Sequence, residues 1–273
     1  MALDPGLDVF QALEPWRVSD PVFARAYLLA GDRGRARIKS AIAALFEAGR
    51  LGRSPSITTA ECFHSGLSYT GRCVSRPWYA LVIGPGVVSS AQVAAALSPA
   101  LARRIPVFVV RPKSRSGWPS AVLAALELAG VEQVFAPPRE SFKRFLKELG
   151  QGGALCCLGD ASFTERVRAI VPRHCFFHRL APPESALLYR GPGVRWDAHA
   201  LAFSHAGLRF LEYGPGASSR EAPHESDAVW AAFAPQDKAP QSARLVLAPG
   251  REALWDWPDM PAELFFSRRL IYS

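Results

Sequence analysis

Gly84, Pro85 and Gly86 form the first loop whose composition indicates chemistry. They follow the apolar run 79–83 and precede a helical pattern that begins at Ser89. A glycine turn between a strand and a helix exposes backbone N–H groups, which bind phosphate. Because Ser89 stands where the third glycine of GxGxxG would be, the motif is incomplete, and its interpretation depends on the neighbouring loops.

A second loop carries positive charge. Arg111, Lys113 and Ser114 follow the apolar run 106–110. In ordinary dinucleotide-binding folds an acidic residue about 20 residues after the glycine motif binds the ribose hydroxyls. A basic loop at this place favours a 2′-phosphate or another phosphorylated nucleotide, so the expected cofactor is NADP or NAD. The alternative is that these side chains are surface cations at a strand end.

A third loop has the same position relative to its strand. Gly159, Asp160 and Ser162 follow the apolar run 154–158 and precede a helical pattern at 164–170. Parallel sheets bind ligands outside the carboxyl ends of their strands. We therefore expect these three loops to hold the cofactor-binding residues.

The cysteines have neither the spacing of a metal site nor that of a disulfide framework. Cys156, Cys157 and Cys175 lie in apolar runs, where cysteine usually behaves as an inert hydrophobic residue. Cys62 and His64 lie two residues apart in a polar stretch, and such a pair can act as nucleophile and base. We expect the spacing of Cys62 and His64 to be a coincidence. No metal site is predicted, because the cysteines lack the spacing of one.

The periodicity of the chain predicts an α/β fold. Apolar runs typical of buried strands alternate with helical patterns, which indicates βαβ units and a doubly wound, mostly parallel sheet of the Rossmann-like type. The predicted strands are 79–83, 106–110, 131–135, 154–158, 174–177 and, as a sixth, 185–189, and the predicted helices between them are 89–101, 121–129, 141–149 and 164–170.

The two ends of the chain are less regular. We expect one domain, 1–273, with N-terminal helices and an irregular segment in 1–77, a nucleotide-binding core in 78–219, and a C-terminal segment, 220–273, that packs back on the core. Further predicted elements are helices at 20–31, 32–49 and 197–208, an irregular segment or hairpin at 53–77, a loop at 214–219, and a strand at 245–248.

The composition excludes several classes of protein. With 49% hydrophobic and 21% charged residues among 273, the chain is too apolar to be disordered. No apolar run reaches the ~18 residues of a membrane helix, and residues 1–10 lack the pattern of a signal peptide. We therefore expect a cytoplasmic globular protein with no membrane partner.

The net charge is +8, and arginines outnumber lysines 27 to 5. This excess favours an anionic partner or, equally, a solvated basic surface. The sequence has no helix-turn-helix, zinc-finger or RNA-recognition signature, which argues against nucleic acid. A nucleotide or small molecule is the expected ligand, and a homo-oligomer or a partner protein stays open.

Three segments resemble the cofactor-binding half of the aldehyde dehydrogenase superfamily. There, a strand and loop are followed by a strand ending in Lys-Pro-Ser and a helix ending in Ala-Gly, and the similar segments here are 80–86, 107–114 and 119–130. Residues 158–162 look like the later Thr-Gly-Ser loop of that superfamily. The resemblance implies a nicotinamide cofactor, with Arg111 at the position of the ribose-binding lysine.

Within the superfamily, residues 111–135 resemble histidinol dehydrogenases and residues 157–219 resemble long-chain acyl-CoA reductases. The sequence departs from the family where the chemistry takes place. Leu180 stands near the position of the general-base glutamate, and the loop 214–219, where the catalytic cysteine is expected, contains none. Ser218 and Ser219 are weak nucleophiles without an assisting base.

Three functions follow from these observations. The first is an aldehyde dehydrogenase-like nucleotide-binding protein without thiol chemistry, either a pseudoenzyme or a partner subunit. The second is an active NAD(P)-dependent dehydrogenase or reductase that uses non-thiol chemistry. The third is a protein-interaction module with a vestigial cleft, which we would expect if Trp255 and Trp257 filled the site.

Overall fold

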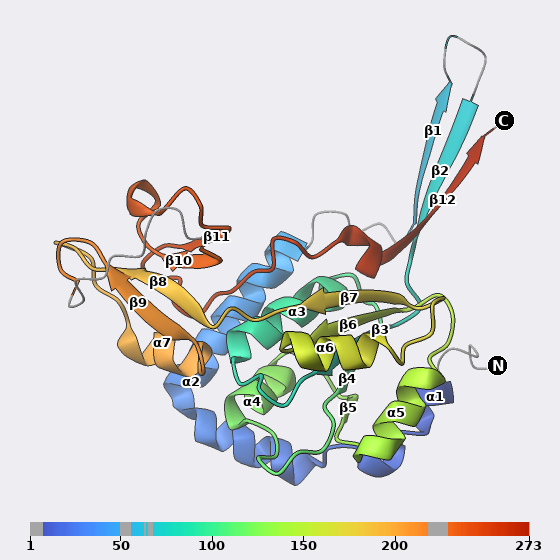
Figure 1. The fold of residues 1–273 in the computed structure, drawn as a ribbon, viewed down its shortest axis with the longest axis horizontal. Helices are drawn as coiled ribbons and strands as arrows, with labels where there is room; N and C mark the ends of the chain where they lie inside the picture. Colours follow the sequence, from blue (N-terminus) through green and yellow to red (C-terminus); the bar gives the residue numbers. More distant parts are fainter. Residues whose placement is uncertain (1–7, 50–55, 63, 65–67, 218–228, 273) are drawn as a thin grey trace.

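The computed structural model describes residues 8–49, 56–62, 64, 68–217 and 229–272. Its centre is a five-stranded parallel sheet in the order β5-β4-β3-β6-β7, seen in Figure 1. The direction of strand addition reverses between β3 and β6, which makes this pair the topological switch point. The strands are β3 (Tyr79–Ile83), β4 (Val107–Val110), β5 (Val134–Phe135), β6 (Ala154–Leu158) and β7 (Phe176–Leu180).

Helices cover both faces of this sheet, because its strands are apolar on both sides. Leu81 and Val109 pack in one hydrophobic cluster, whereas Val82 and Val110 pack in the other. This confirms the predicted doubly wound α/β fold. The first cluster contains α2 (Asp20–Gly49), α3 (Ser90–Ala102) and α4 (Ser120–Leu128), and the second contains α1 (Asp8–Gln11), α5 (Arg139–Lys147) and α6 (Ala161–Arg168).

A second, four-stranded parallel sheet follows, in the order β11-β10-β8-β9. The predicted strand 185–189 is present, but it belongs to this sheet and not to the first. The predicted helix 197–208 ends at Ser204, where His205 is the C-cap, and a strand that the periodicity did not predict comes next. The elements are β8 (Ser185–Tyr189), α7 (Ala198–Ser204), β9 (Arg209–Tyr213), β10 (Ala231–Phe233) and β11 (Leu245–Leu247).

A third sheet is antiparallel and extends away from the body in Figure 1. Strand β2 lies at its centre, between β1 from the same hairpin and β12 from the C-terminal segment. The segment 53–77, predicted as irregular or a hairpin, is thus a hairpin over its described residues. The strands are β1 (Ser56–Cys62), β2 (Ser68–Ser75) and β12 (Phe266–Tyr272).

Several element boundaries differ from the predicted ones. Strand β5 contains only the last two residues of 131–135, and β7 begins two residues later than 174. Helix α6 begins three residues earlier than 164, because Asp160 caps it. Residues 20–49 form two helices that continue across a break at Gly31, where φ is 62°, as predicted. Three short 3-10 helices are η1 (Glu14–Trp16), η2 (Gln236–Lys238) and η3 (Ala262–Leu264).

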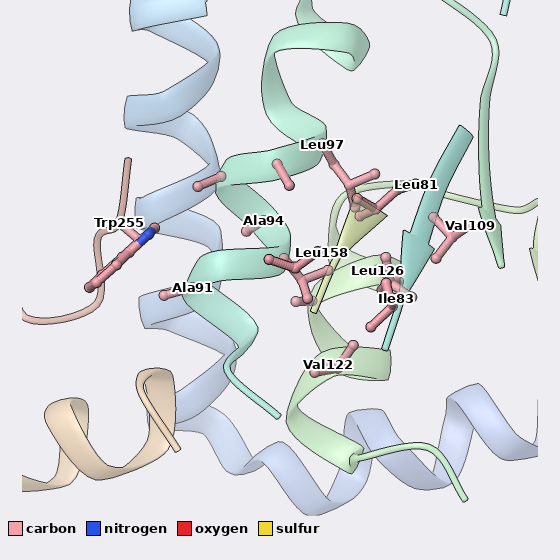
Figure 2. Packing of buried hydrophobic residues seen from close by; sticks show 14 of the residues in the cluster. Leu81, Ile83, Ala91, Ala94, Leu97, Val109, Val122, Leu126, Leu158 and Trp255 are labelled. Atoms are coloured by element: carbon pink, nitrogen blue, oxygen red, sulfur yellow. The ribbon is translucent and has the colours of Figure 1, made fainter. Parts of the chain in front are cut away.

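The aromatic residues that precede β12 pack on the body. Trp255 and Trp257 are buried, and the Trp257 indole N–H donates to the carbonyl oxygen of Gln92 in α3 at 3.0 Å. Figure 2 shows Trp255 beside Ala91 on one side of α3, with Leu81 of the central sheet on the other. Within the described residues, no helix is long and apolar enough to cross a membrane.

Candidate nucleotide-binding site

Gly84 and Gly159 lie side by side at the switch point of the central sheet. The Gly84 N–H donates to the carbonyl oxygen of Leu158 at 2.8 Å, so the ends of β3 and β6 are joined. A Cβ atom at Gly84 would lie 3.0 Å from the Phe163 ring, and one at Gly159 would lie 2.8 Å from it. A side chain at Gly159 would force the Phe163 ring to shift, and one at Gly84 would press on it, because this buried ring of α6 packs directly on the two backbones.

The first turn of α6 already carries a negative charge. The Asp160 carboxylate accepts a hydrogen bond from the Phe163 N–H at 2.7 Å and caps the helix. The Ser162 hydroxyl accepts a hydrogen bond from Arg166. Asp160 and Ser162 are exposed, and the Asp160 charge lies where a phosphate bound at this helix terminus would approach.

Arg111 is buried, with 2% of its surface exposed. Its guanidinium donates to the carbonyl oxygens of Val87 at 2.8 Å and Pro85 at 2.6 Å, and lies 5.6 Å from the centre of the Trp118 ring. Burial lowers the pKa of Arg111 below its ordinary value. The structure thus places this side chain on the turn of Gly84, Pro85 and Gly86, which it holds to the end of β4.

A pocket of about 350 Å³ opens beside Arg111, at the carboxyl ends of β4 and β5. Lys113 is exposed at this pocket and supplies a positive charge. Arg111 and Trp118 also line the pocket, and their Nε and indole nitrogens are buried beneath its surface with no hydrogen-bond acceptor among the described residues. The principal lining residues are Trp16, Arg111, Lys113, Ser114, Trp118 and Pro138.

The structure thus brings together Arg111, Lys113 and Ser114 of the predicted site, and joins the glycine turn to them through Arg111. Gly159, Asp160 and Ser162 follow β6, which lies two strands from β4 in the sheet, and they do not line this pocket. Sequence reasoning missed both tryptophans. Trp118 follows the basic loop closely enough to have been found, whereas Trp16 comes from η1, which reaches the sheet through a bridge between Arg17 and Phe135.

The cysteines in the central sheet are not poised for nucleophilic chemistry. Burial raises the pKa of Cys156 to about 12 and that of Cys175 to about 11, and it raises the pKa of Cys157 further. Cys62 ends β1 in the third sheet. Among the described residues, no group of three His, Cys, Asp or Glu side chains is arranged to hold a metal ion.

Of the positions implied by the family resemblance, Leu180 is buried at the end of β7. Ser218 and Ser219 lie outside the described residues. In the preceding turn, a Cβ at Gly214 would lie 2.6 Å from the carbonyl oxygen of Arg190, so this turn packs closely against the end of β8.

Comparisons with known proteins place the fold. No protein-family model matches the chain, and no curated protein matches it in sequence. A histidinol dehydrogenase from Elizabethkingia anophelis has a similar structure, with a TM-score of 0.60 and 11% identity over 100% of this chain and 85% of that one.

An NAD-dependent benzaldehyde dehydrogenase from Corynebacterium glutamicum has a TM-score of 0.50 and 11% identity, over 98% of this chain and 89% of that one. An indole-3-acetaldehyde dehydrogenase has a TM-score of 0.47 at 11% identity, over 98% and 87% of the two chains. The chain therefore has the fold of the histidinol and aldehyde dehydrogenases.

Proposed function

We propose that this protein binds a phosphorylated nucleotide, NADP in preference to NAD, in the pocket at the ends of β4 and β5. One observation carries the proposal. Lys113 is exposed at a pocket that Arg111 and the rings of Trp16 and Trp118 also line, so positive charge and flat aromatic surface border the same hollow. An anionic ligand pairs with the lysine, and a nucleotide also places flat apolar surface against the aromatic rings.

The pocket suits one end of a dinucleotide. At about 30 Å³ for a water-sized group, its volume of about 350 Å³ holds about a dozen non-hydrogen atoms. That is enough for a ribose and a phosphate. The rings of Trp16 and Trp118 offer flat apolar surface beside the charged group. The rest of the cofactor would extend along the strand ends towards the glycine turn.

The site favours nucleotide binding over a vestigial cleft. An interaction module was expected if Trp255 and Trp257 filled the site. These two residues pack on α3 and do not line the pocket. Between the two nucleotide-binding functions we propose the non-catalytic one, a regulatory or partner subunit, because the lining of the pocket includes no His, Cys, Asp or Glu side chain that could act as a base or nucleophile. An active dehydrogenase with non-thiol chemistry is the second candidate, and the fold shared with histidinol dehydrogenase supports it.

Calorimetric titration with NADP and NAD tests the proposal. We expect NADP to bind more tightly than NAD, and Lys113→Ala to weaken NADP binding by about tenfold or more through loss of a charge-assisted contact. Arg115→Ala is the matched control, because Arg115 is an exposed cation of the same loop outside the pocket lining. The absence of binding to either nucleotide, or equal losses in the two variants, would refute the proposal.

A further inference from the structure

A second cleft, of about 320 Å³, lies between α2, α7 and the segment 250–254 that follows β11. It shares no lining residue with the nucleotide pocket. One wall is a face of α2 on which the side chains are small, so the neighbouring elements leave a hollow. Four small residues form this wall, Ala36, Ser40, Ala41 and Ala44, which recur at helical spacing.

Glu252 lines the cleft and is buried, with 7% of its surface exposed. One carboxylate oxygen, Oε1, accepts hydrogen bonds from the N–H groups of Gly250 at 3.1 Å and Asp197 at 3.4 Å. The other oxygen, Oε2, receives no donor from any described residue, and protein atoms do not seal it off. This carboxylate is thus held in place but keeps an unused acceptor.

No described cation neutralises Glu252. None of the ion pairs within 4.0 Å in the described part of the chain includes it. Two arginines line the cleft. Arg37 is engaged by Asp197 and by the His199 ring at 2.7 Å, whereas Arg251 is exposed and forms no ion pair within 4.0 Å among the described residues. Glutamate is rarely buried unless it is paired, because removing its charge from water is costly.

The backbone around Glu252 is also fixed. His205 Nε2 lies 2.7 Å from the carbonyl oxygen of Glu252, and the ring packs among Phe210, Phe233 and Trp255. Burial lowers the pKa of His205 to about 4, so the ring is neutral near pH 7 and supplies no balancing charge. The carboxylate is therefore preorganised beside an open hollow.

We propose that this cleft is a binding site for a small organic cation, a primary ammonium group on a short aliphatic body. The ammonium group would donate to Glu252 Oε2, and the aliphatic body would lie against the alanines of α2. A metal ion fits less well, because no described group of three His, Cys, Asp or Glu side chains is arranged to ligate one. The volume holds about ten non-hydrogen atoms at about 30 Å³ each.

The test is calorimetric titration of the full chain with n-butylammonium chloride. We expect saturable binding in the millimolar range or tighter, and loss of about tenfold or more in affinity for Glu252→Gln. This variant keeps an oxygen for the Gly250 and Asp197 N–H groups and removes the charge. Equal heats with potassium chloride, or unchanged affinity in Glu252→Gln, would overturn the proposal.

A second variant tests the site without changing Glu252, in case Glu252→Gln impairs folding. Ala36 is exposed and lines the cleft, so Ala36→Leu should fill the hollow and abolish binding. Ala43 is also exposed on α2 but does not line the cleft, so Ala43→Leu should bind as the unchanged protein does. Identical binding by both leucine variants would contradict this location. Sodium butyrate, an anion with the same aliphatic body, should give no saturable binding.

Discussion

The guanidinium of Arg111 holds the turn after β3 by donating to two of its carbonyl oxygens. A residue of this type at a strand end is expected to contact a ligand, and the basic loop was predicted for that reason. In the fold its terminal nitrogens donate to the turn, and its Nε is buried without an acceptor among the described residues. This side chain therefore shapes the turn beside the site, whereas Lys113 supplies the exposed charge.

The role of Arg111 in the turn predicts a stability effect. Arg111→Met keeps much of the apolar volume and removes both donors, so two carbonyl oxygens lose their partners. We expect the free energy of unfolding to fall by roughly 2 to 4 kcal/mol, measured by urea denaturation. Arg115→Met, at an exposed position of the same loop, should change it by less than about 0.5 kcal/mol. Equal stability of the two variants would show that the turn does not depend on Arg111.

His205 connects several elements of the second sheet. It follows the last residue of α7, and its ring packs against Phe210 of β9, Phe233 of β10 and Trp255 of the C-terminal segment. Its Nε2 is within hydrogen-bond distance of the Glu252 carbonyl oxygen, whereas Nδ1 is buried without a partner. A charged imidazole is therefore disfavoured in the folded protein.

This burial predicts a dependence of stability on pH. The pKa of His205 is about 4 in the folded protein, below its ordinary 6.5, so the folded state binds fewer protons between these values. The contribution of His205 to the free energy of unfolding is complete above pH 6.5. It falls by about 3 kcal/mol as the pH drops to 4. We expect His205→Gln to flatten this slope in urea denaturation curves measured across the range. The same slope in both proteins would contradict the assignment.

At the scale of the whole molecule, the central sheet was predictable because its strands are buried on both faces. Such strands appear in sequence as continuous apolar runs, as in residues 79–83 and 154–158, and their connections follow from the helices between them. Two strands of the second sheet, β8 and β11, were predicted, but the sheet was not, because β9 is only half-buried and β10 has three residues. Their pairing with β8 depends on contacts distant in sequence.

The candidate sites also divide into parts that local sequence patterns predict and parts that depend on contacts distant in sequence. The basic loop of the nucleotide pocket was predicted because it directly follows a strand of the central sheet, whereas the loop after β5 that contributes Ala136 and Pro138 was not. Trp16 and the cleft at Glu252 were not, since both arise where distant segments meet: η1 with the end of β5, and α2 with the segment after β11. Local patterns in the sequence carry no information about such meetings.

The most direct test of nucleotide binding at this pocket is protection of lysines from acetylation, read by mass spectrometry with and without NADP. The chain contains five lysines, of which only Lys113 lines the pocket. We expect NADP to slow acetylation of Lys113 and to leave Lys39 and Lys143, on α2 and α5, unchanged. Unchanged reactivity of Lys113 at an NADP concentration that saturates the calorimetric titration would contradict the proposed site.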